Sequence, residues 1–339
     1  MPNTMDDDVQ DGKSTDTAEL SSPLTWTPEH NAYTLSASAV ENSSIPDLKE
    51  SLALARIFLP KFDTDYVQFR NEVVRHVLSH RSIALLIYML DHEGVPVSLV
   101  TPNIIFAWAS RPLIEALVAR GWDVNVQDVA AFSRKRLIDY LVRERYGKED
   151  MARWLVEEKG AVVNSEQSDT DGDNARAQPP PLLATCAAFG TVAMFKFLEE
   201  KGARPSRRIL HVAVETAAGR GADPCCEVPA QSPGRRARDI GIEMLRYLVE
   251  ERQLDINAMD ADEPYQNPTN SHWGTPICYA ARCRNGAPVV RWLLKKGADP
   301  TFKIPYSGLD ALAYAREAKC DEILSVLEEW QWTRNQGND

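Results

Sequence analysis

Short segments in which apolar residues recur every three or four positions are the clearest pattern along the chain. Residues 151–160 read MARWLVEEKG, and residues 244–253 read MLRYLVEERQ in the same register. This spacing places the apolar side chains on one face of a helix, so each segment predicts a short amphipathic helix. Looser copies lie at 113–125, 195–203 and 290–300. The recurrence predicts a chain that is built from repeated helical units.

Most of these helices end in glycine, and several follow a second helix with an opening of its own. Glycine accepts the left-handed conformation that ends a helix. The upstream helix is clearest at 275–281, TPICYAA, where Thr275 can cap the helix and Pro276 suits its first turn. Residues 101–107, TPNIIFA, open in the same way. Each repeated unit is therefore expected to be a helix-turn-helix hairpin.

A hairpin that opens Thr-Pro-Leu-His-x-Ala and closes Gly-Ala-Asp-x-Asn resembles the ankyrin repeat, and Thr275–Pro300 matches this pattern best. The resemblance implies an all-α solenoid that binds proteins and has no activity of its own. About seven helix-turn-helix units are expected, with degenerate capping units at both ends. Their ranges are 66–94, 99–125, 132–164, 180–205, 207–257, 273–302 and 307–332. Insertions at 165–179, 219–239 and 261–271 make the array similar to the divergent ankyrin proteins of filamentous fungi.

The repeat array, expected at 66–332, is flanked by segments of different composition. Residues 1–47 hold nine acidic residues and one lysine, and thus most of the net charge of −11. This segment is also rich in Ser, Thr, Asn and Pro, which predicts a disordered acidic tail. It is either a solubilising leader or a partner-binding motif around its aromatic residues. A lead-in or capping helix is expected at 48–65 and a short C-terminal tail at 333–339.

Catalytic and metal-binding motifs are missing from the sequence. No Gly-x-Ser-x-Gly, His-Glu-x-x-His or Gly-x-x-x-x-Gly-Lys motif occurs. His76 and His80 have the spacing of a two-histidine metal site, but no third ligand lies nearby in the sequence. We therefore expect no catalytic residue, no metal and no cofactor. The alternative is an enzyme or small-ligand-binding protein that uses the insertion at 219–239, where Cys225 and Cys226 are adjacent.

Three aromatic residues and two arginine clusters are candidates for contacts with a partner. The aromatic residues stand at or near the expected finger loops, at Trp122, Trp273 and Phe302. The arginines lie in one connection and in the insertion that follows it, at Arg204, Arg207, Arg208, Arg235, Arg236 and Arg238. Exposed aromatic residues anchor interfaces, although a large ring can instead cover the flank of the next unit. The arginines suit an acidic peptide or a phosphate, or they are simply solvated loop residues.

Composition narrows the classes of function. The chain has 38 Lys and Arg residues against 49 Asp and Glu, which argues against direct binding of nucleic acid. No apolar run reaches the roughly 18 residues of a membrane span, and the N-terminus lacks the pattern of a secretory signal. We expect a cytoplasmic or nuclear, non-catalytic protein–protein interaction module with an unidentified protein partner and no membrane contact. The acidic tail and the import-like Arg235-Arg236-Ala237-Arg238 favour a transcription co-regulator over a regulatory scaffold.

Overall fold

The computed structural model describes most of the chain as helices joined by turns. The described residues are 28–59, 63–128, 134–143, 147–164, 181–222, 237–260, 274–305 and 307–336, with only the backbone at 28–30, 63–65, 237 and 238. No strand occurs within these ranges, where extended pairing is limited to one isolated bridge between Gln127 and Arg136. The all-α fold class is thereby confirmed. The chain divides into two compact units, Met1–Val95 and Pro96–Asp339, called here the N-terminal and C-terminal units.

The N-terminal unit begins with a helix that the sequence did not predict. Its helices are α1 (Pro28–Glu41), α2 (Ile45–Phe58), α3 (Asp63–His80) and α4 (Ile83–His92). The disordered tail expected through residue 47 is therefore wrong for α1, which packs on α2 and is bonded to it by Ser51 Oγ, 2.8 Å from the Ala32 carbonyl oxygen. The lead-in helix expected at 48–65 begins earlier, at Ile45, after the capping residue Ser44.

One buried carboxylate connects three helices of the N-terminal unit. Glu93, 8% exposed, accepts hydrogen bonds from Arg56 of α2 at 2.6 Å, Tyr66 of α3 at 2.9 Å and Tyr88 of α4 at 3.1 Å. Burial, and then the hydrogen bond to this carboxylate, raise the pKa of Tyr66 to about 12. A buried charge is tolerated because it is paired and hydrogen-bonded. The segment 66–94, expected as the first ankyrin unit, thus belongs to a separate four-helix unit.

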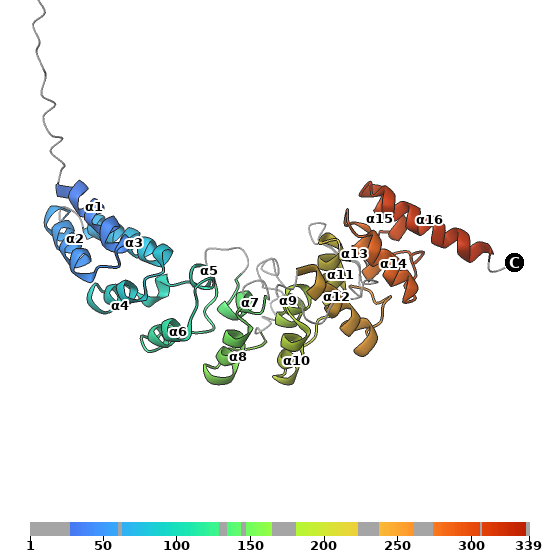
Figure 1. Ribbon diagram of the computed structural model, residues 1–339, viewed down its shortest axis with the longest axis horizontal. Coiled ribbons are helices and arrows are strands. Elements are labelled where there is room, and N and C mark those ends of the chain that lie inside the picture. Colours follow the sequence, from blue (N-terminus) through green and yellow to red (C-terminus); the bar gives the residue numbers. More distant parts are fainter. Residues whose placement is uncertain are drawn as a thin grey trace, which may run out of the picture. The chain divides into compact units, whose positions relative to one another are not determined.

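The C-terminal unit consists of successive helix pairs, in which the first helices form one row and the second helices another (Figure 1). Its elements are η1 (Val97–Leu99), α5 (Pro102–Ile105), α6 (Arg111–Val118), α7 (Leu137–Leu141), α8 (Glu149–Glu158), α9 (Leu182–Phe189), α10 (Val192–Glu200), α11 (Ile209–Gly219), α12 (Ala237–Arg246), the π-helical turn η4 (Tyr247–Glu251), α13 (Pro276–Ala281), α14 (Ala287–Lys295), α15 (Ala311–Glu317) and α16 (Asp321–Gln336). These pairs correspond to the six units expected from residue 99 onward. The expected C-terminal tail is wrong at its start, because α16 continues to Gln336.

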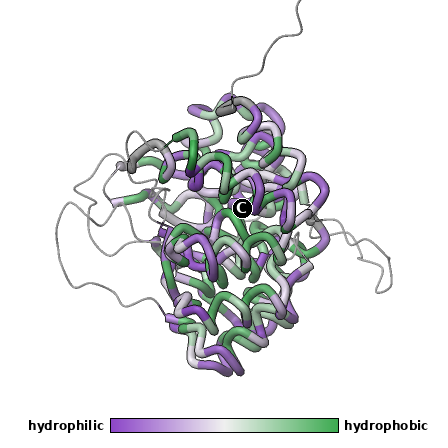
Figure 2. The backbone as a smooth tube through the Cα atoms, turned by 90° about the vertical axis from the view of Figure 1, so that its left-hand side faces the viewer, coloured by the Kyte–Doolittle hydropathy of each residue, from purple (hydrophilic) through white to green (hydrophobic). Residues whose placement is uncertain are grey.

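The core of the C-terminal unit lies between the rows and between neighbouring pairs. Hydrophobic and hydrophilic positions alternate along the helices, as amphipathic helices require (Figure 2). The first helices α9, α11, α13 and α15 contact one another in sequence. Their facing positions are largely small, and Ala217, Ala280 and Ala315 are fully buried. Small side chains allow the helix axes to approach closely, so a narrow, dense core forms along the stack.

Four of the ion pairs between neighbouring second helices form what we call the acid–base ladder. In these four the acid belongs to the earlier helix pair and the base to the later one, whereas Lys196–Glu251 at 3.2 Å and Arg291–Glu322 at 3.3 Å have the opposite order. The rungs are Glu115–Lys159 at 3.6 Å, Glu157–Lys201 at 3.0 Å, Glu199–Arg252 at 2.8 Å and Glu250–Lys296 at 2.8 Å. All these side chains are partly exposed, so each rung stabilises the fold by at most about 1 kcal/mol.

Gly274, which precedes α13, is a position where only glycine fits. Its φ is +93°, and a Cβ atom there would collide with the side chain of Ile304, which is fully buried. Gly297 has the same φ of +93° but nothing within 4 Å of its Cβ position. We predict that Gly274→Ala costs about 1–3 kcal/mol more than Gly297→Ala, because only the first adds overpacking to backbone strain.

Urea unfolding of both variants, followed by circular dichroism, measures this difference. Gly297→Ala is the matched control for the cost of a left-handed residue. Equal losses of unfolding free energy in the two variants would show that Ile304 does not restrict this position.

Candidate binding surface

Asparagine side chains hold the finger turns of neighbouring helix pairs together. Each asparagine lies four residues after the left-handed residue that follows a helix, which is Gly121, Gly160 or Gln253. It accepts a backbone N–H from the next pair and donates to the carbonyl of a glycine there. The three sets are Asn125 with Val162 N at 2.8 Å and Gly160 O at 3.2 Å, Asn164 with Arg204 N at 2.8 Å and Gly202 O at 2.9 Å, and Asn257 with Asp299 N at 2.8 Å and Gly297 O at 3.3 Å. Their recurrence after the helix-ending glycine was visible in the sequence, but no role was assigned to them.

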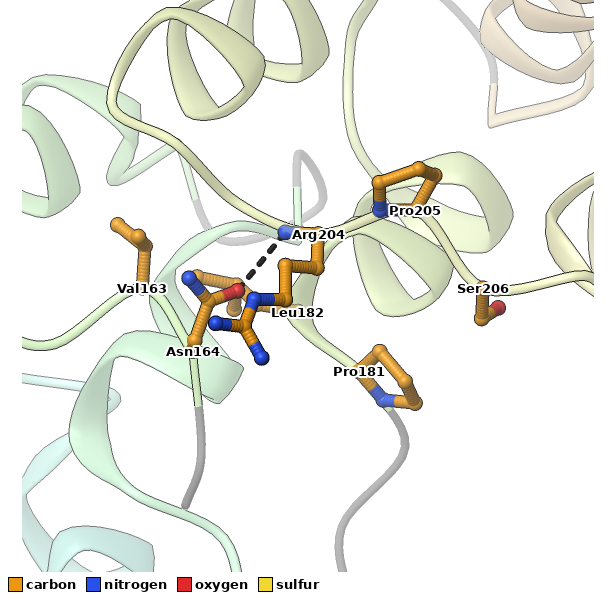
Figure 3. A pocket seen from close by; sticks show the side chains of 7 residues that line it. All are labelled: Val163, Asn164, Pro181, Leu182, Arg204, Pro205 and Ser206. Carbon is orange, nitrogen blue, oxygen red and sulfur yellow. Dashed lines mark hydrogen bonds between the residues drawn. The ribbon is translucent and has the colours of Figure 1, made fainter. Parts of the chain in front are cut away.

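One of these clamps forms the wall of an open cleft of about 190 Å³ (Figure 3). The cleft is lined by Val163, Asn164, Pro181, Leu182, Arg204, Pro205 and Ser206, and we call it the Arg204 cleft. The Arg204 side chain extends beside the Asn164 amide, while prolines lie on the other side of the opening. Arg204 is exposed, and within the described part of the chain no carboxylate pairs with its guanidinium group. An uncompensated positive charge therefore stands over walls that combine polar and apolar surface.

The other predicted arginines contribute to this surface unequally. Arg207 is exposed close to Arg204 in the sequence. Arg208 points inward instead, donating to the Tyr279 hydroxyl at 3.1 Å with its guanidinium 5.7 Å from the ring centroid. The remaining three cannot be assigned to the cleft: Arg235 and Arg236 lie outside the described residues, and only the backbone of Arg238 is described, within α12.

The three aromatic residues that were predicted to contact a partner also differ in their surroundings. Trp122 is 4% exposed, and its Nε1 donates to the Val100 carbonyl oxygen at 2.8 Å. It is therefore a core residue of its own helix pair, and the expectation of an exposed anchor is wrong. Phe302 is 39% exposed on the finger turn after α14, so it remains a proposed contact. Trp273 lies outside the described residues.

A buried polar network lies behind the cleft. His211, fully buried, meets the Ala258 carbonyl oxygen through Nε2 at 2.9 Å, and its ring packs against Tyr279 at 5.2 Å. The Tyr279 hydroxyl donates to Asp260 Oδ2 at 2.6 Å, and this oxygen also accepts the Gly274 N–H at 3.0 Å. Asp260 is therefore hydrogen-bonded to Gly274, the first described residue after the insertion. Burial lowers the pKa of His211, so the imidazole is neutral at physiological pH.

The described cysteines and acids do not form a reactive or metal-binding centre. Burial raises the pKa of Cys186 well above its usual range, and that of Cys278 and Cys283 to about 11, so these thiols stay protonated. Across the described ranges, no group of three His, Cys, Asp or Glu side chains has the geometry to hold a metal ion. The adjacent Cys225 and Cys226 lie outside those ranges. None of the helices searched there is long and apolar enough to cross a membrane.

Stacked helix pairs with clamped finger turns define a helical repeat architecture. The family model for the ankyrin repeat matches residues 274–303, which contain α13 and α14. Residues 274–303 are thus an ankyrin repeat, as the resemblance of Thr275–Pro300 predicted. No curated protein matches the chain. Ankyrin repeats bind protein partners and are generally non-enzymatic, so the matched repeat indicates a protein-interaction module.

The burial of Trp122 predicts a large effect on stability. Trp122→Ala removes a buried ring and its hydrogen bond, which we expect to lower the unfolding free energy by about 3–5 kcal/mol. Phe302→Ala is the control, since truncating a ring that is 39% exposed removes less buried surface and should cost less than Trp122→Ala. Chemical denaturation measures both. Similar midpoints for Trp122→Ala and the wild type would contradict the burial of this ring.

The buried neutral His211 predicts a pH-dependent stability. Because burial holds its pKa below that of the unfolded chain, the unfolded state takes up the proton first as the pH falls. Stability is therefore retained above about pH 6.5 and declines below it, by at most about 1.4 kcal/mol per pH unit for one proton. Denaturation between pH 8 and 5 should show this slope reduced in His211→Gln. Identical slopes for His211→Gln and the wild type would exclude His211 as the source.

Proposed function

We propose that the array is a regulatory scaffold that binds an acidic segment of a protein partner in the Arg204 cleft. The observation that carries this proposal is the exposed guanidinium group without a carboxylate partner among the described residues. In the acid–base ladder, by contrast, each Lys or Arg is matched by a glutamate. An unmatched base on an acidic protein is an attractive site for a carboxylate, because Arg binds carboxylates in a bidentate manner.

The walls of the cleft narrow the chemistry of the partner further. Val163, Pro181, Leu182 and Pro205 present apolar surface on either side of the charge. A segment that places Glu, Asp or a phosphorylated residue next to an apolar side chain fits both features. Asn164 holds the backbone of Arg204 at 2.8 Å, so the cleft is formed before the partner arrives and little ordering accompanies binding.

The finer expectation of a transcription co-regulator rests on the acidic N-terminal sequence and on the arginine-rich segment at 235–238. Residues 1–27 and most of that segment lie outside the described residues, so this expectation stays a prediction. The alternative of an enzyme that uses the insertion at 219–239 is supported by no cluster of reactive groups in the described part of the chain. Protein binding therefore remains the favoured function.

Charge reversal at Arg204 tests the proposal. Arg204→Glu places a carboxylate against the acidic ligand, and we expect the affinity to fall about tenfold or more. The probe is a fluorescent peptide that contains Glu, Leu and Pro, and binding is followed by anisotropy. Melting should be unchanged, because Arg204 is exposed.

The matched control is Arg75→Glu, which makes the same charge change at an exposed position of α3. It separates local binding from a general effect of net charge. Binding of the peptide equally by Arg204→Glu, Arg75→Glu and the wild type would reject the Arg204 cleft as the site.

A further inference from the structure

A buried ion pair at the start of α7 is hydrogen-bonded to a finger turn. Arg136 and Asp139, which are 4% and 2% exposed, form a bidentate pair in which Nε and Nη2 of the arginine each lie 3.2 Å from a carboxylate oxygen. The third guanidinium nitrogen, Nη1, donates to the Val162 carbonyl oxygen at 2.6 Å. Val162 belongs to the finger turn after α8. The arginine therefore joins the start of the first helix to the finger turn of the same helix pair.

This link to the finger turn distinguishes the pair in α7 from its counterpart in α13. Both pairs join the residue before a first helix to the residue three places later. In α13 these residues are Thr275 and Cys278, whose side-chain atoms lie 3.3 Å apart. Both of those side chains are short, so their contact stays at the helix start, whereas the arginine reaches the finger turn as well. A buried ion pair is weak evidence for stability, so a role in placing a neighbouring segment is the better explanation for it.

Val162 is held from both sides, two residues before a wall of the Arg204 cleft. Its N–H donates to Asn125 Oδ1 at 2.8 Å, and its carbonyl oxygen accepts the bond from Arg136. Asn164, which lines the cleft, then accepts the Arg204 N–H at 2.8 Å (Figure 3). A shift of the backbone at Val162 would therefore move both the wall of the cleft and the bond to Arg204.

The finger turn that contains Arg204 lacks two of the contacts that hold the turn before it. Pro181 precedes α9 where Arg136 precedes α7, and proline has no side-chain donor. Ser206 lies four residues after the left-handed Gly202, the place from which the asparagines reach the next pair. Its buried hydroxyl oxygen has no hydrogen-bond partner among the described residues. The placement of Arg204 thus depends on the preceding finger turn.

We propose that Arg136 and Asp139 are positioning residues for the Arg204 cleft, acting through the finger turn after α8. This inference rests on the proposed function, because it concerns how the same site is held ready for its ligand. The ion pair fixes the start of that turn, and Asn164 at its end fixes the backbone of Arg204. A binding group that is ordered in advance loses less entropy when the partner binds. Two side chains that do not line the cleft therefore raise its affinity.

Transferring the α13 pair to α7 tests this proposal. Because removing one partner of a buried ion pair is strongly destabilising, both residues are replaced together. The double variant Arg136→Thr, Asp139→Cys keeps a local contact at the helix start but loses the bond to Val162. We expect it to raise the Kd of the fluorescent acidic peptide about three- to tenfold. In an Arg204→Ala background it should change the Kd less than about twofold, because its effect is exerted through Arg204.

Two asparagine clamps supply a second variant and its matched control. Asn125→Ala releases the Val162 N–H but leaves the ion pair in place, so it should weaken peptide binding by a similar factor. Asn257→Ala removes the same kind of clamp from Asp299, in a different finger turn, and should bind the peptide like the wild type. Equal losses of affinity in the two variants would indicate a general loosening of the turns and would overturn the proposal.

Hydrogen exchange of the Arg204 amide, followed by NMR without peptide, separates this proposal from the proposed function. The double variant should exchange this amide about tenfold faster than the wild type, because the bond to Asn164 opens more often. A wild type that does not bind the peptide rejects the proposed function, and the exchange rates then decide on the positioning role. Unchanged exchange, or a peptide affinity that the double variant leaves unchanged, overturns the positioning role and leaves the cleft itself as the proposed site.

Discussion

A helix hairpin with one apolar face is stable here only when a neighbouring hairpin covers that face, and the rest of the C-terminal unit depends on this stacking. α11 shows the constraint clearly, because it packs between α9 and α13 and has Ala213, Ala217 and Ala218 all buried. Larger side chains at these positions would push the hairpins apart. Close stacking brings consecutive finger turns within reach of a single side chain, and the asparagine clamps follow from that distance. The geometry of the Arg204 cleft is thus a consequence of core packing.

Two kinds of polar contact join neighbouring hairpins, and they have different effects on the structure. The clamps made by Asn125, Asn164 and Asn257 bond to backbone groups, so they fix where each turn lies relative to the next. The acid–base ladder joins flexible, partly exposed side chains, and such pairs contribute little free energy and weaken in salt. The backbone clamps, rather than the ion pairs, therefore position the finger turns.

The sequence predicted those features whose signal is local. Periodicity and terminal glycines located the second helices, and the opening Thr275-Pro276 located α13. α1 was missed because its buried side is made of Ala32, Ser36 and Ala39, which produce almost no hydrophobic periodicity. The remaining wrong predictions concern side chains whose partners are distant in the sequence. Trp122 stands in a finger turn by sequence, but its ring turns inward to a carbonyl 22 residues away, and Arg208 turns to Tyr279, 71 residues away. Local sequence patterns do not predict contacts with such distant partners.

The proposed site also shows why net charge is a poor guide to binding on a repeat protein. The chain carries −11 overall, which by itself disfavours an anionic ligand. In an array, however, charges are matched between neighbours, and fields beyond about 8 Å are screened at physiological salt. A ligand at Arg204 therefore experiences mainly the groups that line the cleft, none of which is a carboxylate. The proposed site on this protein is therefore found where the matching of charges between neighbouring helix pairs is interrupted, at Arg204.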